Sequence, residues 1–169
     1  MQESITTNFD PPREESLIQF RDCLFEIEDV ETAMVLFVSG AKSLLGVNFM
    51  TLVIHTGLSD SYYVLEISAH SRRGVIQMKC HPLRIVEMIT RRWKAEFRIK
   101  AIIGNHRTIL GYLVAGGDKR KGLTVEDALT WENLAALAST VFINLIKPNT
   151  HHYRYEKNAK RKKSKDPVN

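Results

Sequence analysis

The stretch "EFRIKAIIGNHRTILGYLVAGG", residues 96–117, gives the strongest hairpin signal in this chain. Residues 96–103 alternate between apolar and polar side chains, which is the period of a half-buried strand. Residues 104–108 supply turn residues, and residues 109–117 return as a more apolar strand. The stretch therefore predicts a β-hairpin, and Gly111 predicts that another backbone or side chain approaches the second strand closely.

A long helix is expected after the hairpin. Thr124 and Asp127 have the spacing of a capping box, with Asp in place of the usual Glu. We expect this helix to run to about Lys147, because Pro148 follows and proline does not fit a helix interior. Its predicted core stripe is Trp131, Leu134, Ala135, Ala138, Val141, Phe142 and Leu145.

Before the hairpin, the apolar period changes at Gly46. Apolar residues from Leu17 to Leu45 recur at helical spacing, which predicts two amphipathic helices or one bent helix with Gly46 as its C-cap. Residues 1–11 are expected to be a disordered lead, and proline at positions 11 and 12 suits the start of a helix.

After Gly46 the period becomes that of strands. Residues 47–56 and 62–68 predict neighbouring antiparallel strands, and residues 75–80 predict a shorter one with Ile76, Met78 and Cys80 on one face. Pro82 then opens a predicted helix with a stripe of Leu83, Val86, Ile89 and Trp93. The resulting order of elements predicts an α+β fold, an antiparallel sheet flanked by helices.

Composition predicts a soluble globular protein of one domain with appendages. The chain has 169 residues, 44% hydrophobic and 25% charged. We expect no membrane span, because no apolar run approaches the required length, and no signal peptide at the N-terminus. These features predict a cytoplasmic protein with a domain over residues 12–147 and a basic disordered tail over residues 148–169.

Charge is unevenly distributed along the chain. The net charge is +5, and residues 148–169 hold seven basic against two acidic residues. Residues 72–121 hold 13 basic and 3 acidic residues, whereas residues 1–46 hold 3 basic and 9 acidic residues. The tail is therefore a separate basic segment, and the rest of the chain is neutral but polarised.

No catalytic or metal-binding pattern is evident in the sequence. Two cysteines, Cys23 and Cys80, are too few for a thiolate zinc site, and the six histidines have no ligand spacing. Paired carboxylates and nucleophile–base constellations with suitable spacing are also missing. We expect no metal and no enzymatic activity, and the sequence names no cofactor.

The order of elements and two longer motifs resemble a GAF domain, the small-molecule sensor module of signalling proteins. The motifs are "VETAMVLFVSGAKSLLGVNFMTLVIHTG" (30–57) and the segment 98–146, which joins the hairpin to "LTVEDALTWENLAALA". The resemblance covers roughly residues 15–147. It implies a sensory or regulatory domain that binds a small molecule or relays a signal to a protein partner.

The resemblance also implies where a ligand lies, which is between the sheet and the connections on one of its faces. The residues expected near such a pocket are Tyr62, Tyr63, Leu65, Met78, Cys80, Val86, Ile89 and Tyr112. The two amphipathic terminal helices, whose apolar stripes exceed what one sheet face needs to cover, further predict a homodimer. The expected dimer residues are Trp131, Leu134, Val141, Phe142 and Leu145.

The stretch "CHPLRIVEM" (80–88) resembles the segment through which bilin-binding GAF domains attach their chromophore. It matches the cysteine, the histidine after it and the methionine eight residues on, although Pro82 and Arg84 replace the usual residues. A bilin photoreceptor that uses Cys80 is therefore one alternative, and an inert structural Cys80 is the other. The cyclic-nucleotide signature N-K-x-F-D-E and the cysteines of free methionine sulfoxide reductases are not reproduced.

Basic residues suggest a different functional class, that of proteins that bind nucleic acids or acidic partners. Residues 91–100 interleave aromatic side chains with cations, and the tail is rich in Lys and Arg, so a nucleic acid or an acidic partner is an alternative ligand. A solvated strand face and a solubilising tail explain the same residues. The candidate contacts are Arg91, Arg92, Lys94, Arg98, Lys100, Lys160, Arg161, Lys162 and Lys163.

Overall fold

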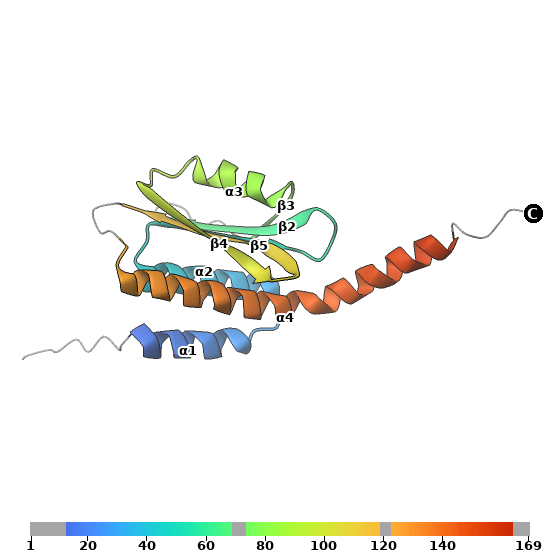
Figure 1. Cartoon of the computed structure of the whole chain (residues 1–169), viewed down its shortest axis with the longest axis horizontal. Helices are drawn as coiled ribbons and strands as arrows, with labels where there is room; N and C mark the ends of the chain where they lie inside the picture. Colours follow the sequence, from blue (N-terminus) through green and yellow to red (C-terminus); the bar gives the residue numbers. More distant parts are fainter. Residues whose placement is uncertain (1–12, 69–73, 119–122, 164–169) are drawn as a thin grey trace, which may run out of the picture.

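A five-stranded antiparallel sheet separates helix α3 on one face from three helices on the other in the computed structural model (Figure 1). The structure describes residues 13–68, 74–118 and 123–163, and side chains within 15–68, 74–118 and 123–146. The strands are β1 (Phe49–His55), β2 (Ser61–Ser68), β3 (Ile76–Lys79), β4 (Phe97–Asn105) and β5 (Thr108–Gly117), in the order β3-β2-β1-β5-β4. The predicted α+β architecture is confirmed.

The predicted hairpin is the pair β4 and β5, which runs from Phe97 opposite Gly117 to Asn105 opposite Thr108 with a register shift between Ile103 and Gly104. The other edge of β5 pairs with β1, and there Gly111 lies opposite Ile54. A Cβ atom at Gly111 would collide with the backbone carbonyl of Val53. The prediction of close approach at this glycine is therefore confirmed.

Two separate helices, α1 (Arg13–Phe25) and α2 (Val30–Leu45), precede the sheet. Asp29 caps α2 by accepting a hydrogen bond of 2.8 Å from the backbone N–H of Thr32. Hydrogen bonding from the side chain of Thr32, and then from its backbone N–H, lowers the pKa of the Asp29 carboxyl. Gly46 ends α2 in the left-handed region with φ of 62°, as its position predicted.

Helix α4 (Val125–Lys163) begins at the predicted capping box. The Thr124 backbone N–H donates to Asp127 Oδ2 (3.0 Å), and the Asp127 N–H donates to Thr124 Oγ1 (3.1 Å). The predicted end at Pro148 is wrong, because the helix continues to Lys163. Proline removes one backbone hydrogen bond and tends to bend a helix rather than necessarily end it. Figure 1 shows that α4 bends and projects beyond the sheet.

Two hydrophobic clusters lie on opposite faces of the sheet. In the larger one, α2 and α4 pack against strand residues such as Leu52, Leu65 and Leu113, and α1 packs on α2 and α4. The smaller one packs α3 (Pro82–Thr90) against Val53, Val64 and neighbouring side chains. Because strand side chains alternate, adjacent residues of β2 belong to different clusters.

One described segment, Val125–Ile146 of α4, is long and apolar enough to cross a membrane by length and composition. The expectation that nothing in the sequence approaches that length therefore needs correction. The segment's buried stripe, with Leu134, Ala138 and Phe142, packs in the larger cluster. This placement is that of a core helix in a folded domain, and a single such helix is weak evidence for a membrane span.

Candidate functional site

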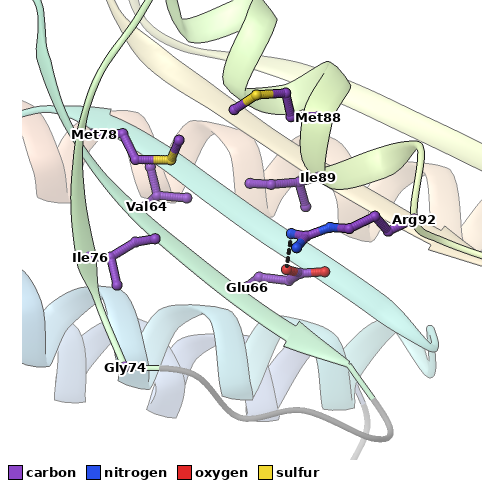
Figure 2. Close-up of a pocket in the computed structure, with 8 residues that line it drawn as sticks. All are labelled: Val64, Glu66, Gly74, Ile76, Met78, Met88, Ile89 and Arg92. Carbon is purple, nitrogen blue, oxygen red and sulfur yellow. Dashed lines mark hydrogen bonds and ion pairs between the residues drawn. The ribbon is translucent and has the colours of Figure 1, made fainter.

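A groove opens between α3 and the β2–β3 edge of the sheet (Figure 2). Helix α3 packs over β1 and β5, so it leaves the outer part of this sheet face uncovered. The groove has a volume of about 320 Å³. Its lining residues are Val64, Glu66, Gly74, Ile76, Met78, Met88, Ile89 and Arg92.

The groove is apolar apart from one ion pair. Glu66 Oε2 lies 3.0 Å from a terminal guanidinium nitrogen of Arg92, and Figure 2 shows the two side chains pointing toward each other. The indole Nε1 of Trp93 donates a second hydrogen bond of 2.8 Å to Glu66 Oε1. The Glu66 side chain is 17% exposed and that of Arg92 is 56% exposed. The carboxylate is therefore sheltered, whereas its cationic partner faces solvent.

A second, more polar cleft of about 540 Å³ adjoins this groove. Glu66 and Arg92 line both hollows, so their ion pair forms the boundary between them. Phe49 and Trp93 stack in the wall of the cleft, with ring centroids 5.3 Å apart. The remaining lining residues are Asn48, Ser68, Lys94, Glu96 and Asp118.

A histidine and a tyrosine meet at the far end of the same sheet face. The rings of His55 and Tyr62 pack edge to face, with centroids 5.1 Å apart. His55 Nδ1 accepts a hydrogen bond of 3.0 Å from the backbone N–H of Gly57. Burial lowers the pKa of His55, and burial together with nearby Asp60 raises the pKa of Tyr62.

Six of the predicted pocket residues share the α3 face of the sheet, and two do not. Leu65 is buried in the larger cluster on the other face, and Tyr63 packs against that cluster. Only Met78 and Ile89 line the groove itself. The other four belong to the smaller cluster beneath and beside α3, and they are Tyr62, Cys80, Val86 and Tyr112. Whether any of the eight contacts a ligand stays a prediction.

Cys80 lies between β3 and α3, and His81 occupies the N-cap position of α3. The thiol is half-buried and packs against the smaller cluster, but it does not line the groove. Met88, the third residue of the bilin-like segment, does line it. Chromophore attachment through Cys80 stays a prediction.

The predicted basic contacts do not form one uniform surface. Arg91 pairs with Glu87, and Arg92 pairs with Glu66. Arg98 donates to the backbone carbonyl of Trp93, and Lys100 Nζ lies 5.6 Å from the ring centroid of Tyr112. Lys94 is exposed. The side chains of Lys160, Arg161, Lys162 and Lys163 lie outside the described residues.

The predicted dimer residues contribute mainly to the chain's own core. Leu134, Val141 and Phe142 are buried against the sheet and the neighbouring helices, so they are not available to a second copy. Trp131 and Leu145 are partly buried against the same cluster. A dimer through α4 stays a prediction, and it would need the exposed side of the helix, where Leu129 lies.

Sequence reasoning missed Glu66, the residue that organises the groove. Its signal was a single carboxylate in an otherwise apolar strand, "SYYVLEIS", two residues after Val64 and hence on the same face. Within the described parts of the chain, no group of three or more His, Cys, Asp or Glu side chains could hold a metal ion.

Known structures share this architecture. The chain superposes on the GAF domain of an Acinetobacter phosphoenolpyruvate-protein phosphotransferase with a TM-score of 0.56 at 9% identity, covering 78% of this chain and 93% of that one. The chain has a GAF-like fold. No family model matches the sequence, and no curated protein matches it either.

Two further solved structures with this fold are a chromophore-binding domain and a reductase. The chromophore-binding domain of a bacteriophytochrome from R. palustris gives a TM-score of 0.58 at 12% identity, with 87% of this chain and 64% of that chain covered. A free methionine-R-sulfoxide reductase from Neisseria meningitidis, solved with its substrate, gives 0.55 at 13% identity, with 83% and 91% covered. At these identities the similarity establishes the fold alone.

Proposed function

We propose that this chain is a non-enzymatic sensory or regulatory domain that binds a small molecule in the groove beside α3. The observation that carries the proposal is the groove itself, a concave and mainly apolar surface with one fixed polar group, Glu66. Ligand sites in proteins combine these two features, because apolar walls supply affinity and a few polar groups set orientation.

The groove is also placed to transmit a ligand's presence. Its walls come from β2, β3 and α3, and the Trp93–Glu66 hydrogen bond ties the segment after α3 to β2. A ligand that contacts Ile89 and Val64 together alters how α3 sits on the sheet. The protein partner that reads this change, and a homodimer as the signalling unit, are part of the proposal.

Native mass spectrometry of the full chain purified from its own host tests this function. The proposal predicts a non-covalent adduct that is released on denaturation, because a sensor with a preformed groove retains part of its ligand. The same spectrum reports whether the chain is a monomer or a dimer. A folded chain that carries no adduct, and acquires none from a small-molecule extract of the host, contradicts the proposal.

A nucleic acid bound across the open face of β4 is a second proposal. It is supported by Arg98 and Lys100, which are exposed and lie two residues apart on the same face of that strand. An affinity for single-stranded nucleic acid that falls steeply with salt, and that is lost in Arg98→Ala with Lys100→Ala, would support it. A salt-independent or unchanged affinity would exclude this face.

A further inference from the structure

The Glu66 carboxylate is the fixed charge of the groove. It lies on β2, next to the middle of the sheet, and each of its oxygens accepts a hydrogen bond from a different donor. Trp93 Nε1, one of these donors, belongs to a side chain that is itself buried and stacked on Phe49. Glu66 therefore stays in place even when its other donor leaves.

Arg92 is the replaceable partner of Glu66. Its backbone N–H is held by the carbonyl of Ile89, but its side chain is 56% exposed, and one hydrogen bond to Glu66 is its described side-chain contact. A long arginine side chain can turn into water at little cost, because its charge is then fully hydrated. The ion pair can therefore open from the Arg92 side only.

The sign of the charge that can enter follows from this asymmetry. A ligand cation that replaces Arg92 leaves Glu66 paired, so one positive charge is exchanged for another. A ligand anion would instead lie beside Glu66, and like charges in a sheltered site repel each other.

We propose that the ligand of this groove is a monocation on an apolar body, an amine or guanidine whose charged group replaces the Arg92 guanidinium on Glu66. This inference rests on the proposed function and adds its ligand class. The apolar body lies against Val64, Ile76 and Met78, with Met88 and Ile89 above it. The thioethers of the two methionines suit an apolar body of variable shape, because they are polarisable and adapt their shape.

Three probes of one shape and different charge test the inference on the full chain. These probes are n-hexylamine, n-hexanol and hexanoate, with binding followed by titration calorimetry near neutral pH. We expect n-hexylamine to bind most tightly, by about tenfold over n-hexanol, since a hydrogen bond to a charged group contributes more than a neutral one. Tighter binding of hexanoate, or equal binding of all three probes, overturns the inference.

Three variants test whether Glu66 binds the charged group of the ligand. Glu66→Gln should lose about tenfold in n-hexylamine affinity while it keeps n-hexanol affinity, because Gln still accepts the Trp93 hydrogen bond. Arg92→Gln should tighten n-hexylamine binding, because the competing intramolecular cation is gone. Glu87→Gln is the matched control, since Glu87 pairs with Arg91 on the outer side of α3 and should leave binding unchanged.

Failure of this inference differs from failure of the proposed function. If Glu66→Gln binds n-hexylamine as well as the wild type does, the inference is wrong even when a host ligand occupies the groove. If none of the three probes binds, the inference is again wrong. The proposed function is wrong when native mass spectrometry finds no adduct, or finds one that does not depend on the groove. Thermal unfolding of each variant confirms that a lost affinity does not come from a lost fold.

Discussion

Trp93 donates its indole N–H to Glu66 at 2.8 Å, and this bond fastens the chain just after α3 to strand β2 across the end of the groove. Because Glu66 and Trp93 are 27 positions apart in the sequence, the bond defines the spacing between two elements that pack only partly against each other. The groove keeps its shape as long as this bond holds.

Replacing Trp93 by Phe should therefore destabilise the domain. Phe keeps the stacking on Phe49 but leaves Glu66 Oε1 without its donor, which costs about 1–3 kcal/mol when an acceptor is sheltered. Urea unfolding measures this change. Arg91→Lys, at the exposed end of α3, is the control and should stay within about 0.5 kcal/mol. A Trp93→Phe variant as stable as the wild type would show that the bond does not hold the two elements together.

Gly111→Ala should prevent normal pairing of β1 and β5. The added methyl group would meet the Val53 carbonyl, a backbone atom that cannot move without displacing the central strand. We expect a loss of about 3 kcal/mol or more, or an unfolded chain. Gly74→Ala is the matched control, since nothing lies within 4 Å of its added methyl group. Equal stabilities of the two variants, measured by urea unfolding, would contradict the register of β1 and β5.

Lowering the pH should weaken the fold through His55. Burial lowers the pKa of His55 in the folded chain below its value in the unfolded chain, which is about 6.5. As the pH falls through about 6.5, the unfolded chain binds more protons than the folded chain. The free energy of unfolding is therefore higher above this pH and decreases below it. In His55→Asn, whose side-chain oxygen can still accept the Gly57 N–H, the unfolding free energy should change less between about pH 8 and about pH 5.5. Parallel pH profiles of the two proteins would assign the loss to other groups.

Local signals in the sequence predicted the elements well. The alternation in residues 96–103, the glycine cap at Gly46 and the capping box at Thr124 each depend on neighbours within a few residues. Such patterns reflect the geometry of a single element, and the structure confirms these three predictions.

Relationships between elements were harder to predict. Tyr62 and Tyr63 were placed in one pocket, yet strand alternation puts them on opposite faces, and sequence alone does not show which face α3 covers. In α3, Leu83 is exposed and Ile85 is buried, because a helix of nine residues turns only a narrow side toward the sheet. Glu66 accepts hydrogen bonds from Arg92 and Trp93, which are more than 25 positions away, so no local pattern marks it.

Removing residues 154–169 should leave the domain nearly as stable as before. The buried stripe of α4 ends at Ile146 among the described side chains, so the deleted segment contributes none of the core described here. We expect a change within about 0.5 kcal/mol in the unfolding free energy. Binding to a nucleic acid or an acidic partner, where it occurs, should fall sharply, because seven cations lie in residues 148–169. A large loss of thermal stability would show instead that the tail packs on the domain.

Two substitutions on α3 test the claim that the groove is a ligand site. Met88 lines the groove and is 45% exposed, whereas Leu83 is 41% exposed on the same helix and does not line it. Met88→Lys and Leu83→Lys thus place the same charge at similar exposure, but only Met88→Lys places it in the groove, where it disfavours an apolar or cationic ligand. Native mass spectrometry of both variants from the host should show the adduct kept in Leu83→Lys and lost in Met88→Lys. An adduct retained equally by both variants would contradict the claim.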